Sequence, residues 1–184
     1  MGDAGVIRVL AISGSLRRVS ANGALVRAAA RLAPAGVEMS VYGGLAEIPP
    51  FNPDLDTEGT PAAVIRFRAA LLASDAILIS SPEYAHGVSG VLKNALDWVV
   101  GSGELMDKAI AVINASARAT HAHAALCETL TTMSGRVIEG ASVTIPLTPL
   151  AFDAAGDLTD VQLSGALTSA IKTLAHAAGG RPGS

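Results

Sequence analysis

The 184-residue sequence predicts an α/β sandwich in which helices cover both faces of a five-stranded parallel sheet. Short apolar runs rich in β-branched residues alternate along the chain with amphipathic segments of helical length. This alternation is typical of right-handed β–α–β crossovers, which build parallel sheets. Hydrophobic residues make up 50% of the chain and charged residues 16%, so the sequence supplies ample material for a core.

The five expected strands are short apolar runs, most of them continuous, as in strands that are covered on both faces. They comprise residues 7–13, 37–42, 76–80, 108–114 and 136–145. The five expected helices comprise residues 20–32, 62–74, 88–100, 120–133 and 159–178. Ser20 is the expected N-cap of the first helix, and the spacing of Lys93 and Asp97 predicts an ion pair on the third.

Residues 48–61 carry four prolines, so we expect an ordered loop or a lid there. No repeat or linker divides the chain, and residues 1–184 are expected to form a single domain with a disordered tail at 179–184. Five parallel strands covered on both sides form a flavodoxin-like or Rossmann-like sandwich. In either fold, ligands bind beyond the carboxyl ends of the strands, so the candidate loops follow the first, third and fourth strands.

Charge, cysteine content and hydropathy narrow the classes of function. A net charge of −3 without a basic patch argues against nucleic acid as a partner. The single cysteine, Cys127, favours a reducing, cytoplasmic compartment, and its place in an apolar helix argues against a nucleophilic role. No apolar run approaches the roughly 20 residues that cross a bilayer, so no membrane span is expected.

The loop after the first strand has the composition of an anion site. Residues 13–22 (SGSLRRVSAN) combine a glycine turn, hydroxyl groups, two arginines and the start of a helix. These supply hydrogen-bond donors, positive charge and the helix dipole. The alternative is that Ser20 only caps the helix and that the arginines are solvated. Neither a dinucleotide fingerprint nor a Walker motif is present in this loop.

The loop after the third strand, SPEYAHGVSG at residues 81–90, leads into VLKNALDW at 91–98. Together with GSLR…S.N after the first strand, this pattern resembles the NADPH-dependent FMN reductase family of flavodoxin-like proteins. NPDLDTEG before Pro61 and SDAILIS before Ser81 also resemble the family's approach to this loop. The resemblance is close over residues 6–98, and two separate motifs in the same order make it specific.

The resemblance implies which residues hold the cofactor. The first loop of family members binds the FMN phosphate, and the matching residues are Ser15, the Leu16 backbone, Arg17, Ser20 and Asn22. The second loop lies along the flavin ring and the ribityl chain, and the matching residues are Pro82, Glu83, Tyr84 and Ala85. Family members commonly have asparagine at the position of Ala85. Ser116 matches the start of the family's third loop.

The loop after the fourth strand, residues 114–123, departs from the family, whose members usually have a glycine-rich stretch there. This chain has no glycine between Gly103 and Gly135. His121 and His123 are two residues apart and point to different sides of a helix, so a metal site is not expected. The two histidines either contact a ring carbonyl or a nicotinamide phosphate or have a role at the helix start or the surface. Arg118 either contacts an anionic cofactor or is solvated.

The resemblance implies an FMN-containing NAD(P)H oxidoreductase in which the flavin, and no catalytic side chain, carries the chemistry. Hydride would pass from NADPH or NADH to flavin N5 and then, in a ping-pong cycle, to a free flavin, quinone, azo compound or metal ion. Family members usually form homodimers or homotetramers, and the apolar helix ending at Trp98 is a candidate interface. Trp98 itself is expected to pack in the core or at a subunit interface. The alternatives are an FMN-binding electron carrier without nicotinamide turnover and a flavin-free interaction or sensing module.

Overall fold

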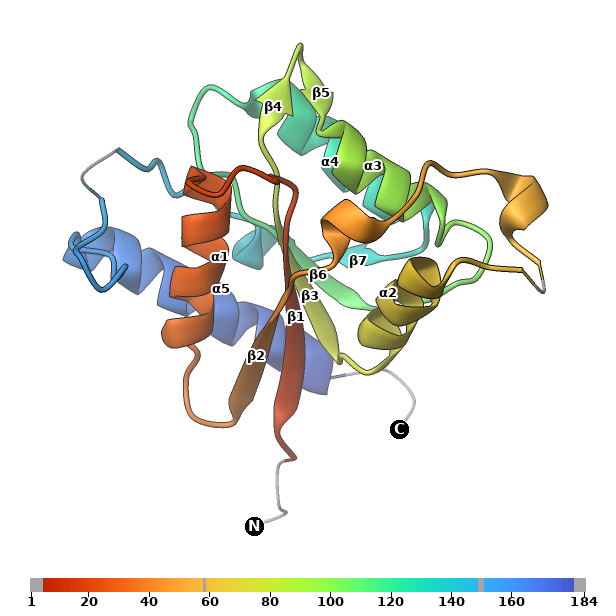
Figure 1. Cartoon of the computed structure of the whole chain (residues 1–184). Helices are drawn as coiled ribbons and strands as arrows, with labels where there is room; N and C mark the ends of the chain where they lie inside the picture. The colour runs from red at the N-terminus through yellow and green to blue at the C-terminus, as the bar shows by residue number, and fades with distance from the viewer. Residues whose placement is uncertain (1–4, 58, 149–150, 181–184) are drawn as a thin grey trace.

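The computed structural model describes residues 5–57, 59–148 and 151–180 (Figure 1). Five parallel strands form one sheet: β1 (Ile7–Ser13), β2 (Val37–Tyr42), β3 (Ala76–Ser80), β6 (Ala109–Val112) and β7 (Arg136–Val137). Their spatial order is β2-β1-β3-β6-β7. Counted along the chain within this sheet, the order is 2-1-3-4-5, which is that of flavodoxin-like folds. The predicted fold class is confirmed.

Helices cover both faces of the sheet, and each face has its own hydrophobic cluster. On one face lie α1 (Ala21–Arg31) and α5 (Val161–Gly179); on the other lie α2 (Ala62–Leu72), α3 (Gly90–Asp97) and α4 (Thr120–Thr132). Successive residues of β1 enter opposite clusters, since Leu10 packs under α2 and α3 whereas Ala11 packs under α1 and α5.

Several predicted details of the helices are confirmed. Ser20 is the N-cap of α1, and its Oγ accepts a hydrogen bond from the Gly23 N–H at 3.3 Å. Lys93 Nζ lies 2.5 Å from Asp97 Oδ1 on α3. The tail predicted at 179–184 begins too early, because Gly179 is the last residue of α5 and Gly180 is its C-cap; residues 181–184 lie outside the described residues.

Two predicted elements are wrong in extent. The expected helix over 88–100 begins at Gly90, because Val88 belongs to a short hairpin made of β4 (Glu83–Tyr84) and β5 (Gly87–Val88). The expected strand over 136–145 is reduced to two residues, followed by a 3-10 turn, η3 (Glu139–Ala141), and an isolated parallel bridge between Thr144 and Asn114. Glu139 and Gly140 have low strand propensity, which accounts for the interruption.

The described residues of the proline-rich segment, 48–57 and 59–61, form an ordered loop, with 3-10 turns η1 (Leu45–Glu47) before it and η2 (Pro53–Leu55) within it. Asn94 on α3 donates from Nδ2 to the Pro49 carbonyl at 2.9 Å and accepts from the Phe51 N–H at 2.7 Å. Trp98 Nε1 donates to the same Pro49 carbonyl at 2.8 Å, and the Phe51 ring packs edge-on against Trp98. Trp98 is fully buried, which confirms its predicted place in the core.

Within the described ranges, no helix is both long enough and apolar enough to cross a membrane.

Candidate functional site

A cavity of about 330 Å³ opens at the carboxyl end of the sheet, between the loops that follow β1, β3 and β6. Its volume lies at the lower end of the range of roughly 300–1,000 Å³ that is usual for small-molecule sites. Its lining residues are Ala21, Asn22, Ser81, Pro82, Glu83, Asn114, Ala115, Ser116, Arg118 and Ala119. The three loops that the sequence singles out therefore meet in one site.

The first two loops touch because residue 14 has no side chain. A Cβ on Gly14 would lie 2.7 Å from Ser81 Oγ and 2.9 Å from Ser89 Oγ, both closer than real Cβ contacts allow. The Gly14 N–H also donates to the Ser80 carbonyl at the end of β3, at 2.8 Å. The glycine turn of the first loop is thus required by the packing against the second loop.

The start of α1 presents free hydrogen-bond donors to the cavity. Gly23 N–H is capped by Ser20, whereas the N–H groups of Ala21 and Asn22 have no hydrogen-bond partner among the described residues. Ser20 uses an acceptor lone pair for capping, so its hydroxyl proton remains available to an oxyanion. Both the capping role and the anion-binding role of Ser20, which the sequence presents as alternatives, are compatible with this geometry.

The arginines near the three loops differ from the arginines elsewhere in whether they form ion pairs. Arg8, Arg31, Arg66 and Arg68 form ion pairs with carboxylates. No carboxylate of the described residues forms an ion pair with the remaining arginines near the loops, which are Arg17, Arg18, Arg27 and Arg118. These unpaired charges suit an anionic ligand.

Arg27 adds positive charge at the start of α1. Its Nη1 atom lies 3.3 Å from the point that a Cβ would occupy on Gly23, so its guanidinium group lies over the first turn of the helix. A cation at this positive end of the helix dipole is unfavourable by itself, and a phosphate beside it would offset the repulsion. The free N–H donors and the arginines therefore fit the phosphate of FMN.

The predicted contact residues divide into three groups. Those that line the cavity are Asn22, Pro82, Glu83 and Ser116. Those on the first loop beside it are Ser15, Leu16, Arg17 and Ser20, and those in the β4–β5 hairpin and its turn are Tyr84 and Ala85. The roles of all ten residues toward FMN stay predictions. Sequence reasoning left Arg118 open and missed five lining residues, which are Ala21, Ser81, Asn114, Ala115 and Ala119.

Asn22 also has a structural role at the base of the cavity. Its side chain is buried, and its Oδ1 accepts a hydrogen bond from Ser80 Oγ at 2.8 Å. This bond ties the first turn of α1 to the end of β3. A phosphate contact of Asn22 would consequently come from its amide nitrogen or its backbone N–H.

Glu83 caps a helix from outside that helix. The Ala122 N–H donates to Glu83 Oε2 at 2.8 Å, while the N-cap residue of α4, Ala119, has no side-chain oxygen to offer. Glu83 and Ala122 are 39 residues apart, so no local sequence pattern indicates the bond. One oxygen of the carboxylate is thereby engaged with α4, and the wall formed by the second loop is tied to the third loop.

The third loop is held by side-chain hydrogen bonds in place of glycines. Asn114 Nδ2 donates to the Ala119 carbonyl at 3.0 Å, and Asn114 Oδ1 accepts from the Ser116 N–H at 3.1 Å. Ser116 Oγ in turn accepts from the Arg118 N–H at 3.3 Å. None of residues 114–123 has a positive φ, so the absence of glycine causes no backbone strain there.

The two-residue turn of the β4–β5 hairpin is strained. Ala85 and His86 have φ angles of 49° and 62°, as the central residues of a type I′ turn require. Asn-Gly is the preferred pair in such turns, and the left-handed conformation costs about 1–2 kcal/mol for a residue with a Cβ. His86 stacks on His121, with ring centroids 4.2 Å apart and planes inclined by 18°.

His123 faces a different neighbour from His121, as the sequence predicts. Its Nε2 lies 3.8 Å from Cys127 Sγ, one turn further along α4. Burial lowers the pKa of His123 and raises the pKa of the Cys127 thiol. Both groups are thereby favoured in their neutral forms, and the raised pKa of the thiol disfavours the thiolate that nucleophilic chemistry needs.

Comparisons with known proteins identify related sequences and structures. Residues 7–148 match the family model described as NADPH-dependent FMN reductase. An NAD(P)H-dependent FMN reductase of Pseudomonas aeruginosa is 38% identical over 159 residues, which cover 84% of this chain and 85% of the relative. A probable NADPH:quinone oxidoreductase of Oryza sativa subsp. japonica is 44% identical over 116 residues, covering 60% and 56%. The solved flavoenzyme NAD(P)H:(acceptor) oxidoreductase of Paracoccus denitrificans superposes with a TM-score of 0.85 at 28% identity, covering 94% of this chain and 97% of that one.

Proposed function

Because the chain belongs to the NADPH-dependent FMN reductase family, we propose that it is an FMN-dependent NAD(P)H oxidoreductase. The observation that carries this proposal is the cavity at the carboxyl end of the sheet. Among the described residues, free N–H donors and arginines without an ion-pair partner lie along the first loop, and the other two loops form the remaining walls. A flat ring joined to a phosphate by a short chain matches this distribution of charge and shape.

The chain's own residues bind and orient the cofactor. Ser15, Arg17, Ser20 and Asn22, with the Leu16 backbone, would hold the phosphate through charge-assisted hydrogen bonds. Pro82, Glu83, Tyr84 and Ala85 on the second loop, and Ser116 on the third, would border the ribityl chain and the ring. Arg17 would be the strongest single contact among these residues, since it combines charge with a planar set of donors.

FMN held at this site would supply the redox chemistry that links NADPH or NADH to a small acceptor in a ping-pong cycle. The acceptors that fit such an open site are free flavin, quinones, azo compounds and oxidised metal ions. No side chain of the cavity is required to act as acid or base. The protein's contribution is to hold the ring in a place that is open to both substrates.

A spectrum of the purified protein after incubation with FMN, followed by anaerobic addition of NADPH or NADH, tests the proposal. We expect a yellow protein that holds on the order of one equivalent of flavin. Its flavin absorbance near 450 nm should bleach when the reduced nicotinamide is added. Bleaching with dithionite but with neither nicotinamide would favour the electron carrier. A protein that stays colourless after FMN incubation and gel filtration would favour the flavin-free module.

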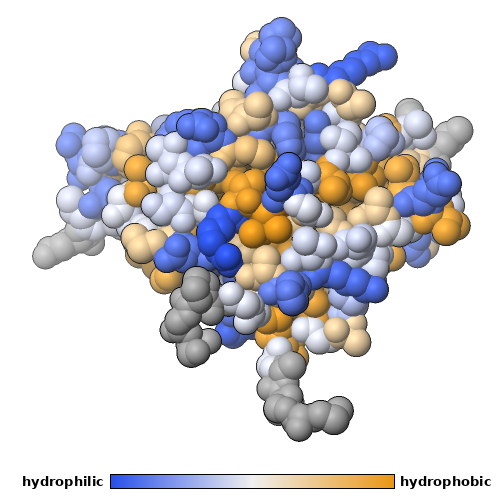
Figure 2. Space-filling view, turned by 180° about the vertical axis from the view of Figure 1, so that it is seen from behind, coloured by the Kyte–Doolittle hydropathy of each residue, from blue (hydrophilic) through white to orange (hydrophobic). Residues whose placement is uncertain are grey.

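We further infer a homodimer or homotetramer in the cytoplasm. Val100 and Met106 are 60% and 62% exposed and line a groove of about 330 Å³ with Met133 beside the carboxyl ends of α3 and α4. Exposed apolar side chains around a groove are typical of subunit interfaces. On the face drawn in Figure 2, apolar groups reach the surface between polar ones.

The lone cysteine supports a reducing compartment. Light scattering after gel filtration would measure the oligomer.

A further inference from the structure

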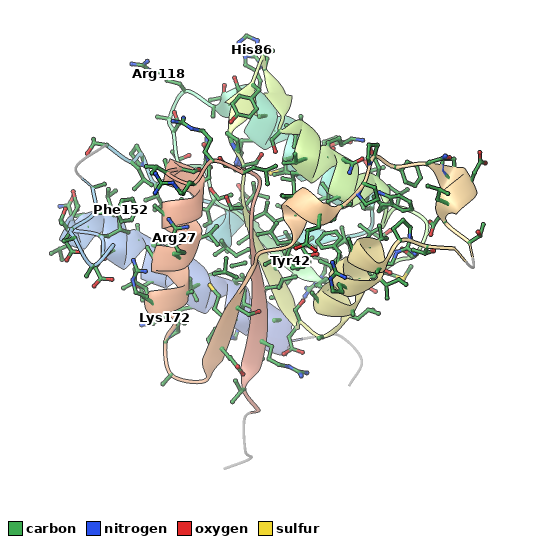
Figure 3. All side chains as sticks on the ribbon, viewed as in Figure 1. Arg27, Tyr42, His86, Arg118, Phe152 and Lys172 are labelled. Atoms are coloured by element: carbon green, nitrogen blue, oxygen red, sulfur yellow. The ribbon has the colours of Figure 1, made fainter. Side chains whose placement is uncertain are left out.

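Two contacts join the β4–β5 hairpin to the first turn of α4. Glu83 accepts from the Ala122 N–H at the base of the hairpin, and the His86 ring stacks on the His121 ring at its tip. Figure 3 shows His86 at this tip, at the same end of the molecule as Arg118. Glu83 and Arg118 line the cavity from opposite loops. The two contacts therefore set the distance between two walls of the cavity.

The hairpin needs such contacts because its own structure is weak. Its two strands have two residues each, and an isolated hairpin of this length is at best marginally stable in water. Both central residues of its turn, Ala85 and His86, hold the left-handed conformation that glycine and asparagine prefer. Strain at the tip favours other arrangements of the hairpin, and an external contact at the tip opposes them.

We propose that His121 is a positioning residue of the flavin site. Its ring holds His86, and through it the strained hairpin, against α4, so that Pro82 and Glu83 stay at the spacing that the flavin requires. His121 does not line the cavity, and it acts on FMN affinity through the hairpin without touching the cofactor. The proposal rests on the FMN site proposed above and adds to it a residue outside the cavity.

Two substitutions of His121 distinguish the contribution of ring stacking from those of hydrogen bonding and charge. We expect His121→Ala to raise the Kd for FMN three- to tenfold, which corresponds to about 0.7–1.4 kcal/mol at 1.4 kcal/mol per factor of ten. His121→Phe keeps a flat ring against His86 and should leave the Kd within about twofold of the wild type. His176→Ala, at an exposed histidine on α5, is the matched control and should leave it unchanged.

A second set of variants removes the need for the contact. Ala85→Asn combined with His86→Gly gives the turn its preferred residues and removes the partner ring. In that background His121→Ala should have no further effect on FMN binding. Hydrogen exchange of apo-protein amides supplies a readout without cofactor: His121→Ala in the wild-type background should accelerate exchange in residues 83–88 and leave α5 unchanged.

The outcomes distinguish this proposal from the one on which it rests. If the wild-type protein binds no FMN, the proposed function fails. If the wild type binds FMN and His121→Ala binds it equally well, the positioning role of His121 is overturned. An equal loss of affinity in both turn backgrounds would also overturn it, because the effect would then arise within α4 and not through the hairpin.

Discussion

Replacing Gly14 by alanine tests whether the loops after β1 and β3 must touch for the cavity to form. A Cβ here would lie 2.7 Å from Ser81 Oγ, 2.9 Å from Ser89 Oγ and 3.1 Å from Ser81 Cβ. Rotating the Ser81 hydroxyl away would still leave its Cβ in close contact. The Ser81 hydroxyl borders the cavity and can turn toward it, but Ser89 is buried, and its Oγ lies only 3.4 Å from that of Ser81. The contacts with Ser81 Cβ and Ser89 Oγ would therefore remain, and one of the two loops would have to shift to relieve them.

Overpacking of this kind typically lowers stability by about 1–3 kcal/mol, and we expect Gly14→Ala to lower the free energy of unfolding by that amount. Urea unfolding of the apo-protein, followed by circular dichroism, measures it as a lower midpoint at unchanged slope. The same shift moves the phosphate loop away from Pro82 and Glu83. A fluorescence titration of the variant should therefore also show weaker FMN binding than in the wild type.

Gly43→Ala is the matched control, because a Cβ on Gly43 meets no atom within 4 Å. Its effect on stability should stay within about 0.5 kcal/mol. Combining Gly14→Ala with Ser81→Gly removes two of the three close contacts, so the double variant should lose less than the sum of the single effects. Equal stabilities of the Gly14 and Gly43 variants, or strict additivity in the double variant, would refute the steric argument.

Two further predictions concern charge. Arg17→Ala should weaken FMN binding by about 1.5–3 kcal/mol through loss of a charge-assisted phosphate contact. The control Arg66→Ala removes an exposed ion pair on α2 and should leave FMN binding unchanged. Isothermal titration at fixed salt compares the two variants. The hydrogen bond from Arg68 holds the pKa of the Asp56 carboxyl below its usual value. The ionised carboxyl therefore stabilises the fold fully above its unfolded-state pKa, and this stabilisation is lost as the pH falls through the folded-state pKa. Asp56→Asn should therefore reduce the acid-side dependence of the urea midpoint between about pH 5 and pH 3.

The parts of the fold that the sequence predicts are those that local pattern determines. The apolar runs of β1 and β3, the cap at Ser20 and the pair Lys93–Asp97 all depend on residues close together in the chain, and all are present in the structure. The hairpin at 83–88 was not predicted because each of its strands has only two residues, too few to show a hydrophobic period.

The missed parts of the site depend on contacts between distant residues. Asn114 closes the third loop by bonding to Ala119, and its own position depends on the end of β6 and on the bridge to Thr144. Glu83 finds its partner on α4 only because the sheet places the loops after β3 and β6 side by side. The resemblance to a family locates these loops in the sequence, but the bonds that link one loop to another require the folded chain.

The two departures from the family pattern have different physical consequences. The third loop lacks glycine, yet none of residues 114–123 has a positive φ, and Asn114 and Ser116 close the loop through their side chains. The hairpin turn, in contrast, does require positive φ at Ala85 and His86, where the preferred pair is Asn-Gly. The backbone strain thus lies in the second loop, beside the His86–His121 stack, and not in the glycine-poor third loop. Differences in FMN affinity between this chain and its relatives should accordingly follow residues 85, 86 and 121 more closely than the glycine content of residues 114–123.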